Sequence, residues 1–113
     1  MNSVKFIVTP VFAKNAKQLS KRYPSFANDL RVLRNSLTEN PEQGSVLAGG
    51  FRKVRMSIAS KGRGKSGGAR VITLNYLLNE QDRTIILVTI YDKADYSSIS
   101  DKEIKTALDS LNN

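Results

Sequence analysis

The pattern of apolar residues over the first forty positions predicts one strand followed by two helices. Residues 4–8, Val-Lys-Phe-Ile-Val, form a short β-rich run. Thr9 then suits the N-cap of a helix, and Pro10 suits its first turn. Apolar side chains next recur every three or four residues in two stretches, which is the period of a helix face. They are Phe12, Ala16, Leu19 and Tyr23 in the first stretch, and Phe26, Leu30, Leu33 and Leu37 in the second.

The period changes from helical to extended after the Gly- and Pro-containing connection at 40–50. Apolar and polar residues alternate over 54–58, which predicts a half-buried strand. Residues 60–68, Ser-Lys-Gly-Arg-Gly-Lys-Ser-Gly-Gly, are too rich in glycine for regular structure and predict a long hairpin loop. We expect further strands at 70–78 and 84–91. The latter is almost continuously apolar, which is typical of an interior strand covered on both faces.

A short helix is expected at the C-terminal end. Ser100 and Glu103 have the spacing of a capping box, in which each side chain accepts a hydrogen bond from the other residue's backbone amide. Ile104, Leu108 and Leu111 then supply an apolar face. The whole chain, 1–113, therefore predicts a single α+β domain of order β-α-α-β-β-β-α. Its helices are expected to pack on one side of a mainly antiparallel sheet.

Composition narrows the chemistry available to this domain. The 113 residues include 18 Lys and Arg against 10 Asp and Glu, a formal charge of +8, with no Cys and no His. A disulfide scaffold, a zinc finger and thiol catalysis are excluded, as is a histidine base. The positive charge points to an anionic partner, most plausibly nucleic acid. No apolar stretch is long enough for a membrane helix or typical of a signal peptide, so we expect a cytoplasmic protein without a membrane partner.

The positive charge is concentrated in the middle of the chain. Residues 51–75 contain seven basic side chains and no acidic one. Within them, Gly62-Arg63-Gly64-Lys65-Ser66 superficially resembles a nucleotide-binding P-loop. Ala59 occupies the position of that motif's first glycine, however, and a strand follows where a helix is required. A P-loop is therefore not expected.

A convergent anion site explains this basic segment better. Lys61, Arg63 and Lys65 alternate with small residues, and Arg70 begins the next strand. Glycines let the backbone approach a ligand closely while several cations meet at one anionic group. Lys93, which follows the last strand, is expected to approach from the neighbouring sheet end. The alternative is a solvated loop kept soluble by its charge, but this leaves Arg70, at the start of an apolar strand, unexplained.

Two segments resemble the RelE/HigB-type toxins of bacterial toxin–antitoxin modules. They are Gly67-Gly68-Ala69-Arg70-Val71-Ile72 and Ile86-Leu87-Val88-Thr89-Ile90-Tyr91-Asp92-Lys93. The order of elements and the length match as well, so the resemblance covers nearly the whole chain. It implies a compact RelE-like fold and a ribosome-dependent endoribonuclease that cuts mRNA in the ribosomal A site and inhibits translation. It also implies no cofactor, and a cognate antitoxin, expected to be a helix-turn-helix DNA-binding protein, as the tightest partner.

The resemblance also assigns roles to residues of this chain. The implied catalytic cations are Lys61, Arg63, Lys65, Arg70 and Lys93. Many relatives use a tyrosine or histidine near the C-terminal helix as a general acid. The simplest alignment places Ile99 at that position, so Tyr91 or Tyr96 is the substitute, and both are also candidates for contacting nucleic acid.

These residues suit metal-independent RNA cleavage by the 2′-hydroxyl of the substrate. The reaction requires deprotonation of that hydroxyl, stabilisation of a pentavalent phosphorane and protonation of the departing 5′-oxygen. Arg70 suits the phosphorane, because its planar guanidinium binds phosphate with two hydrogen bonds. Crowded cations lower one another's pKa, so Lys61 or Lys65 is expected to shift from about 10.4 toward 7–8 and act as base. Lys93 or a tyrosine is then the acid.

The remaining cations suggest surfaces that contact ribosomal RNA. Lys53 and Arg55 share the polar face of the strand near residue 54, and a second basic patch lies on the first helix. That second patch comprises Lys14, Lys17, Lys21 and Arg22. Solubility alone would explain both patches equally well. Two other functions stay open: a non-catalytic RNA- or ribosome-binding module, and a gyrase-directed toxin of the related ParE type, which the full cation set disfavours.

Overall fold

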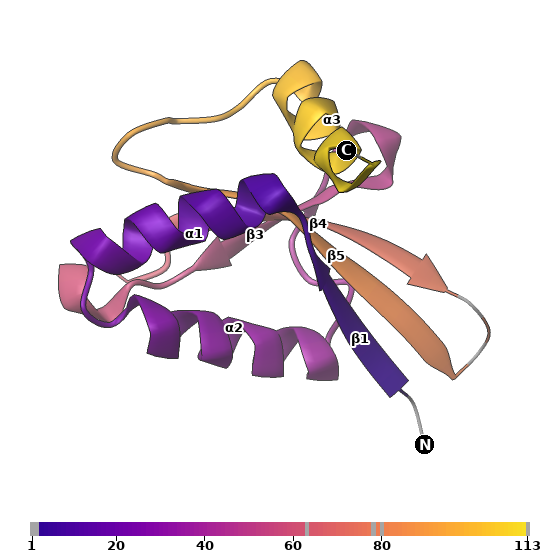
Figure 1. Cartoon of the computed structure of the whole chain (residues 1–113). Helices are drawn as coiled ribbons and strands as arrows, with labels where there is room; N and C mark the ends of the chain where they lie inside the picture. Colours follow the sequence, from indigo (N-terminus) through magenta and orange to yellow (C-terminus); the bar gives the residue numbers. More distant parts are fainter. Residues whose placement is uncertain (1–2, 63, 78, 80, 113) are drawn as a thin grey trace.

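A five-stranded sheet with helices on both of its faces forms the protein (Figure 1). The computed structural model describes residues 3–62, 64–77, 79 and 81–112. The helices and strands, in chain order, are β1 (Ser3–Val8), α1 (Pro10–Arg22), α2 (Phe26–Glu39), β2 (Ser45–Val46), β3 (Arg52–Met56), β4 (Ala69–Leu77), β5 (Asp82–Asp92) and α3 (Asp101–Asp109). The α+β class is confirmed, and the two-residue strand β2 is the addition to the expected order.

The sheet places its most apolar strand in the interior. The strand order is β1-β5-β4-β3-β2, with β1 parallel to β5 and every other pair antiparallel. Ile85 and Leu87 of β5 belong to one buried cluster, whereas Ile86 and Val88 belong to another. Because successive side chains of a strand point to opposite faces, β5 is covered on both sides, as its unbroken apolar sequence predicts.

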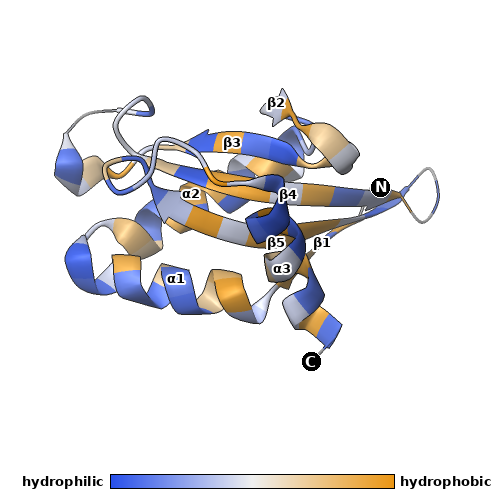
Figure 2. Cartoon of the chain, turned by 90° about the horizontal axis from the view of Figure 1, so that it is seen from above, coloured by the Kyte–Doolittle hydropathy of each residue, from blue (hydrophilic) through white to orange (hydrophobic). Residues whose placement is uncertain are grey.

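The helices are distributed over both faces of the sheet. Leu33 and Leu37 of α2 pack in the cluster that contains Ile85, whereas Ile104 and Ala107 of α3 pack in the other. Figures 1 and 2 show α2 and α3 on opposite sides of the strands, with α1 running beside β5. The prediction that all helices pack on one side of the sheet is therefore wrong. The arrangement differs because β5 and β4 present apolar side chains on both faces, and each face requires cover.

Local signals at the helix ends are confirmed. The Thr9 hydroxyl accepts a hydrogen bond from the amide of Phe12 at 2.9 Å and donates one to the carbonyl of Val88 at 2.7 Å. The capping box of α3 forms between Ser100 and Glu103. Among the described residues, no helix is both long and apolar enough to cross a membrane.

A β-bulge in β5 sets the orientation of the last residues of that strand. Ile72 of β4 is paired with Thr89, but the next residue of β4, Thr73, is paired with Leu87. Val88 is thus an extra residue in β5, and the alternation of side chains shifts by one after it. As a result Ile90 joins the same cluster as Ile85 and Leu87 on the α2 face.

Candidate functional site

Two of the cations predicted to converge, Lys61 and Arg70, lie on opposite faces of the sheet. Arg70 alternates with Ile72, whose side chain packs with α3, so Arg70 belongs to the α3 face. Lys61 instead contacts Asp92 and Tyr23, on the side where Ile90 packs with α1 and α2. The structure therefore separates Lys61 from Arg70, because the short 3-10 helix Ala59–Lys61 turns toward the α1 end.

Asp92 is the centre of the site that holds Lys61. Its residue is 1% exposed, and one carboxylate oxygen accepts a hydrogen bond from Lys61 Nζ at 2.7 Å. The other oxygen accepts bonds from Arg22 Nη1 at 3.0 Å and from the hydroxyl of Tyr23. Arg22 also pairs with Asp95 at 2.8 Å. We call these five residues the Asp92 cluster. It joins the end of α1, the start of the glycine-rich loop and the end of β5.

The cluster stabilises the charged form of its buried carboxylate. Burial by itself raises the pKa of Asp92, but the hydrogen bonds from Lys61, from Tyr23 and from the backbone amide of Ala94 outweigh it and lower the pKa to about 2. The hydrogen bond to Asp95 is the main reason that the pKa of Arg22 is raised above its ordinary value. Lys61 thus lies against a carboxylate that it shares with Arg22, and not in the cation-only surroundings expected from its neighbours in the sequence.

On the α3 face, strand register aligns three of the predicted residues. Arg55 of β3 is paired with Arg70 of β4, and Arg70 is paired with Tyr91 of β5. Directly opposed residues of an antiparallel pair have Cα atoms about 4.5–5.5 Å apart. We call Arg55, Arg70 and Tyr91 the arginine row. The sequence analysis named all three, but in two separate groups of residues.

Arg70 is the buried member of the row and fixes the loop before its strand. The residue is 5% exposed. Its Nη1 atom donates to the carbonyl of Lys65 at 2.9 Å and to that of Ala69 at 3.2 Å, and Nη2 donates to the carbonyl of Ser66 at 3.1 Å. The guanidinium therefore holds the loop backbone while adding a fixed positive charge to the face.

Among the described residues, the charges of the arginine row have no carboxylate partner. Like charges directly opposite each other across two strands are destabilising. The ion pairs among the described residues involve Arg22, Lys61 and Arg83, and neither Arg55 nor Arg70 takes part in one. Arg55 is exposed. An uncompensated cation pair with one buried and one exposed member is suited to binding an anion from solution.

Tyr91 completes the row with a buried hydroxyl. Its oxygen has no hydrogen-bond partner among the described residues. Burial raises the pKa of Tyr91, an effect that the charge of Arg70 partly opposes. The ring of Tyr96, which is 57% exposed, meets that of Tyr91 edge to face, with centroids 6.4 Å apart. A protonated phenol thus lies beside Arg70, and an exposed aromatic ring lies beside the phenol.

The other predicted residues flank this row. Lys65 and Lys93 are exposed, and the backbone amide of Lys93 donates to the carbonyl of Gly68 at 3.0 Å, which ties the end of β5 to the loop. A Cβ atom at Gly68 would lie 2.0 Å from the Met56 carbonyl oxygen, so only glycine fits there. Lys53 is half-buried and paired with Ile72. Arg63 lies outside the described residues.

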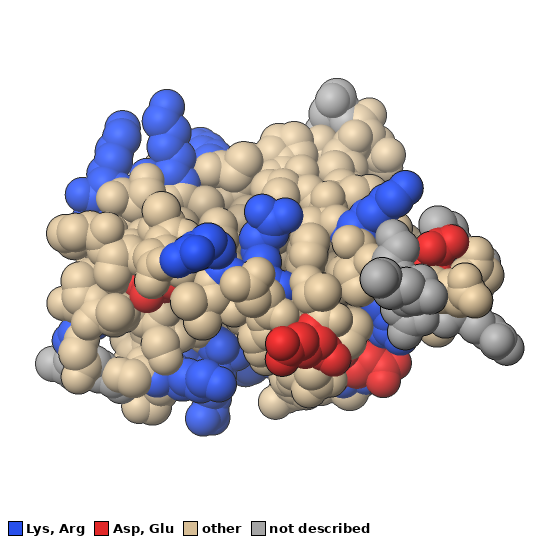
Figure 3. Space-filling view, turned by 90° about the horizontal axis from the view of Figure 1, so that it is seen from below, with Lys and Arg blue, Asp and Glu red and all other residues tan. Residues whose placement is uncertain are grey.

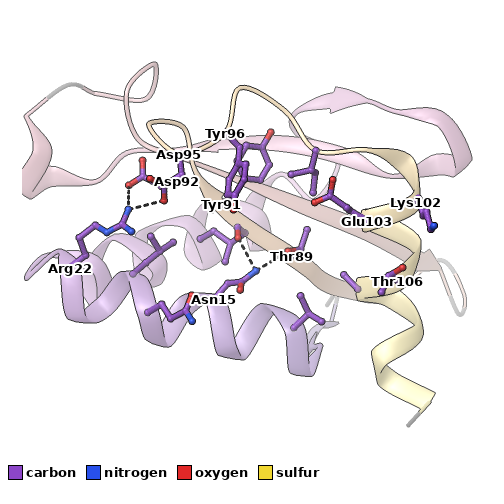
Figure 4. A pocket seen from close by; sticks show the side chains of 16 residues that line it. Asn15, Arg22, Thr89, Tyr91, Asp92, Asp95, Tyr96, Lys102, Glu103 and Thr106 are labelled. Carbon is purple, nitrogen blue, oxygen red and sulfur yellow. Dashed lines mark hydrogen bonds and ion pairs between the residues drawn. The ribbon is translucent and has the colours of Figure 1, made fainter.

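A cavity of about 540 Å³ opens between α1, β5 and α3 (Figure 4). Tyr91 and Tyr96 are among the residues that line it, so it adjoins the arginine row. Asn15 lies in its wall, donating to Thr89 Oγ1 and to the carbonyl of Ile90 at 3.3 Å each. Asn15 and Asp92 are site residues that the sequence does not indicate, since the side chains that they contact lie more than thirty positions away.

On the α2 side of the molecule, the basic residues do not form one compact patch. Lys14, Lys17 and Lys21 of α1 are exposed, as the apolar spacing of that helix predicts. Figure 3, a view of the α2 side, shows Lys and Arg side chains at several separate places on this surface. Arg22 belongs to the Asp92 cluster.

No protein-family model matches the chain.

Proposed function

We propose that the protein is a RelE/HigB-type toxin that acts as a ribosome-dependent endoribonuclease on mRNA in the ribosomal A site. The arginine row is the observation that carries this proposal: two arginines paired in strand register, with no carboxylate partner among the described residues, beside a buried phenol. The α+β fold and the exposed Lys65 and Lys93 around the row also support it. In this proposal the protein works in the cytoplasm and is silenced by a cognate antitoxin.

The proposed reaction is attack of the 2′-oxygen on the adjacent phosphorus, with loss of the 5′-oxygen of the next nucleotide. The products are a 2′,3′-cyclic phosphate and a 5′-hydroxyl. Arg55 and Arg70 stabilise the negative charge that develops on the phosphorane. Lys65, on the loop that Arg70 fixes, takes the proton of the 2′-hydroxyl in the form in which its amine is neutral. The roles differ from those first expected, because Lys61 is engaged by Asp92 and acts as an anchor for the loop.

Tyr91 is the proposed general acid for the departing 5′-oxygen. Burial raises its pKa, so the phenol is protonated at neutral pH and has a proton to donate. Its hydroxyl has no partner among the described residues, and a buried polar group in that state gains a hydrogen bond when a substrate oxygen arrives. Lys93, exposed at the end of β5, is the alternative acid.

Mapping of message ends tests this proposal. Purified protein is incubated with mRNA, with and without translating ribosomes, and the ends are mapped by primer extension. We expect codon-periodic cuts only with ribosomes, and a loss of cleavage of about 100-fold or more in Arg70→Ala. Arg31→Ala, an exposed arginine of α2, is the matched control and should cleave as the wild type does. Equal cleavage of free and ribosome-bound mRNA, or full activity of Arg70→Ala, would contradict the proposal.

One observation favours a second candidate, a non-catalytic RNA- or ribosome-binding module. Lys61 is bound to Asp92 and Arg70 to three backbone carbonyls, so two of the expected catalytic cations have structural tasks. Such a module would bind ribosomes and inhibit translation without producing new mRNA ends. DNA damage without mRNA cuts after brief expression would instead indicate a gyrase-directed toxin.

A further inference from the structure

Apart from Tyr91, the residues that line the cavity between α1, β5 and α3 have no role in the phosphate chemistry above. Its volume of about 540 Å³ lies within the range of about 300–1,000 Å³ typical of small-molecule sites. The wall is of mixed character, with Leu19 and Ile99 beside the polar side chains that Figure 4 labels. Such a wall suits a ligand with apolar faces and polar edges.

The charges of the lining exclude a phosphate as the main occupant. Asp92, Asp95 and Glu103 contribute carboxylates, whereas Arg22 and Lys102 contribute the cations. Arg22 already bridges Asp92 and Asp95 at 3.0 and 2.8 Å. An additional anion would meet more carboxylates than cations. A neutral, planar ligand with hydrogen-bonding edges avoids this repulsion.

The cavity is continuous with the arginine row through two tyrosines. Tyr91 belongs to the row and also lines the cavity, while the exposed Tyr96 lines it and packs edge to face on Tyr91. Proteins recognise single-stranded RNA by binding phosphates with cations and by stacking an unstacked base on an aromatic side chain. Phosphate cations and a base-sized cavity therefore adjoin on this face.

We propose that this cavity binds one unstacked base of the RNA whose phosphate contacts the arginine row, and that it prefers guanine to uracil. The inference rests on the proposed RNA substrate. Guanine offers two adjacent donors, N1–H and the N2 amino group, which match the two oxygens of a carboxylate, and its O6 accepts from a cation. Asp95, paired with Arg22 at 2.8 Å, presents both groups at the cavity wall. Uracil has one donor between two acceptors.

Nuclear magnetic resonance of the uniformly ¹⁵N-labelled full chain tests the proposal without requiring cleavage. The protein is titrated separately with inorganic phosphate, guanosine 5′-monophosphate and uridine 5′-monophosphate. Phosphate should shift amide signals of the loop and of Arg55 and Arg70. The guanosine nucleotide should in addition shift those of Asn15, Thr89 and Thr106, with a Kd at least about threefold lower than that of the uridine nucleotide.

A pair of variants isolates the base contact. Asp95→Asn replaces one carboxylate oxygen by a donor, so the guanosine and uridine nucleotides should bind with equal Kd. Asp109→Asn changes an exposed carboxylate of α3 that lies outside the cavity lining, so this variant should keep the preference for the guanosine nucleotide. Asp95 is exposed, so its replacement leaves the fold intact.

The outcomes separate the two proposals. Nucleotides that shift only the signals shifted by phosphate would overturn the base site and leave the arginine row as a phosphate site. Equal Kd values for the two nucleotides in the wild type would overturn the guanine preference. Absence of any shift with phosphate or nucleotide would contradict the base site together with the phosphate contacts of the proposed function.

Discussion

Lys61 and Arg55 are six positions apart in one basic segment, yet their electrostatic surroundings are opposite in sign. Lys61 lies against a buried carboxylate at 2.7 Å, with a side chain that is 11% exposed. Arg55 is exposed, is paired across two strands with another arginine and takes part in no ion pair of the described residues. The first arrangement completes the fold, whereas the second leaves charge available for a ligand.

The comparison shows that the positive charge of the 51–75 segment has two separate uses. A buried ion pair that loses one partner destabilises the protein strongly, since the remaining charge stays uncompensated. An exposed cation without a partner costs little to remove but is available to contact phosphate. Mutation of Lys61 should therefore affect stability, whereas mutation of Arg55 should affect RNA binding. The two properties can be measured independently.

The largest expected effect on stability comes from removing the central carboxylate. Asp92→Ala leaves Lys61 and Arg22 without this anion, and the free energy of unfolding should fall by about 3–5 kcal/mol. Urea denaturation followed by circular dichroism measures the change. Asp95→Ala removes a carboxylate that is 42% exposed and should cost at most about 1 kcal/mol. Equal losses in the two variants would show that Asp92 is not the centre of the cluster.

The second-largest expected effect is a decrease in the free energy of unfolding in acid, where the Asp92 carboxylate becomes protonated. The pKa of Asp92 is about 2 in the folded protein, below the value of about 3.9 in an unfolded chain. A lowered pKa stabilises the fold above the unfolded value, and this contribution, about 2.5 kcal/mol, is lost as pH falls through 4 to below 2. Urea denaturation at pH 5 and pH 2 measures it. Asp92→Asn should lack this component, and an identical acid dependence in that variant would assign it to other groups.

Arg55→Ala should have a small effect on stability and a clear one on RNA binding. The side chain is exposed, so the free energy of unfolding should change by no more than about 0.5 kcal/mol. The slope of log Kd against log salt for single-stranded RNA should decrease by about 0.7, because one phosphate contact is lost. Lys61→Met is the counterpart, with reduced stability and an unchanged slope. A reduced slope in Lys61→Met would mean that the Asp92 cluster also contacts RNA.

Tyr91→Phe should have the smallest effect on stability. The hydroxyl that it removes has no partner among the described residues, so the free energy of unfolding should stay within about 0.5 kcal/mol or rise slightly. Cleavage on ribosomes should nevertheless fall by about 100-fold or more if the phenol is the general acid. Tyr23→Phe, which removes a donor to Asp92, should instead lose stability. Full cleavage by Tyr91→Phe would transfer the acid role to Lys93.

Features that depend on neighbouring residues were predictable from the sequence. Thr9, Pro10 and the Ser100–Glu103 pair mark helix starts through contacts within three residues, and the structure confirms them. The alternation near residue 54 and the apolar run near residue 86 correctly indicated strands. These signals are local, so a single sequence contains them in full.

The partners of the charged residues were not predictable in the same way. Lys61 and Asp92 are 31 positions apart, and only the packing of the 3-10 helix against the end of β5 brings them together. In the sequence, Lys61 is one of several closely spaced cations, which predicts mutual repulsion and gives no sign of Asp92. The two-sided placement of α2 and α3 was also missed, although the continuous apolar run of β5 contained that information.

The bulge residue Val88 determines which face of the sheet carries each charged or polar side chain at the C-terminal end of β5. Since strand side chains alternate, the single inserted position decides that Tyr91 lies beside Arg70 and that Asp92 lies beside Lys61. With regular pairing the two residues would exchange faces. The carboxylate would then neutralise the arginines, and the phenol would leave a lysine buried without an anion. One unpaired residue thus determines which side of the sheet remains cationic.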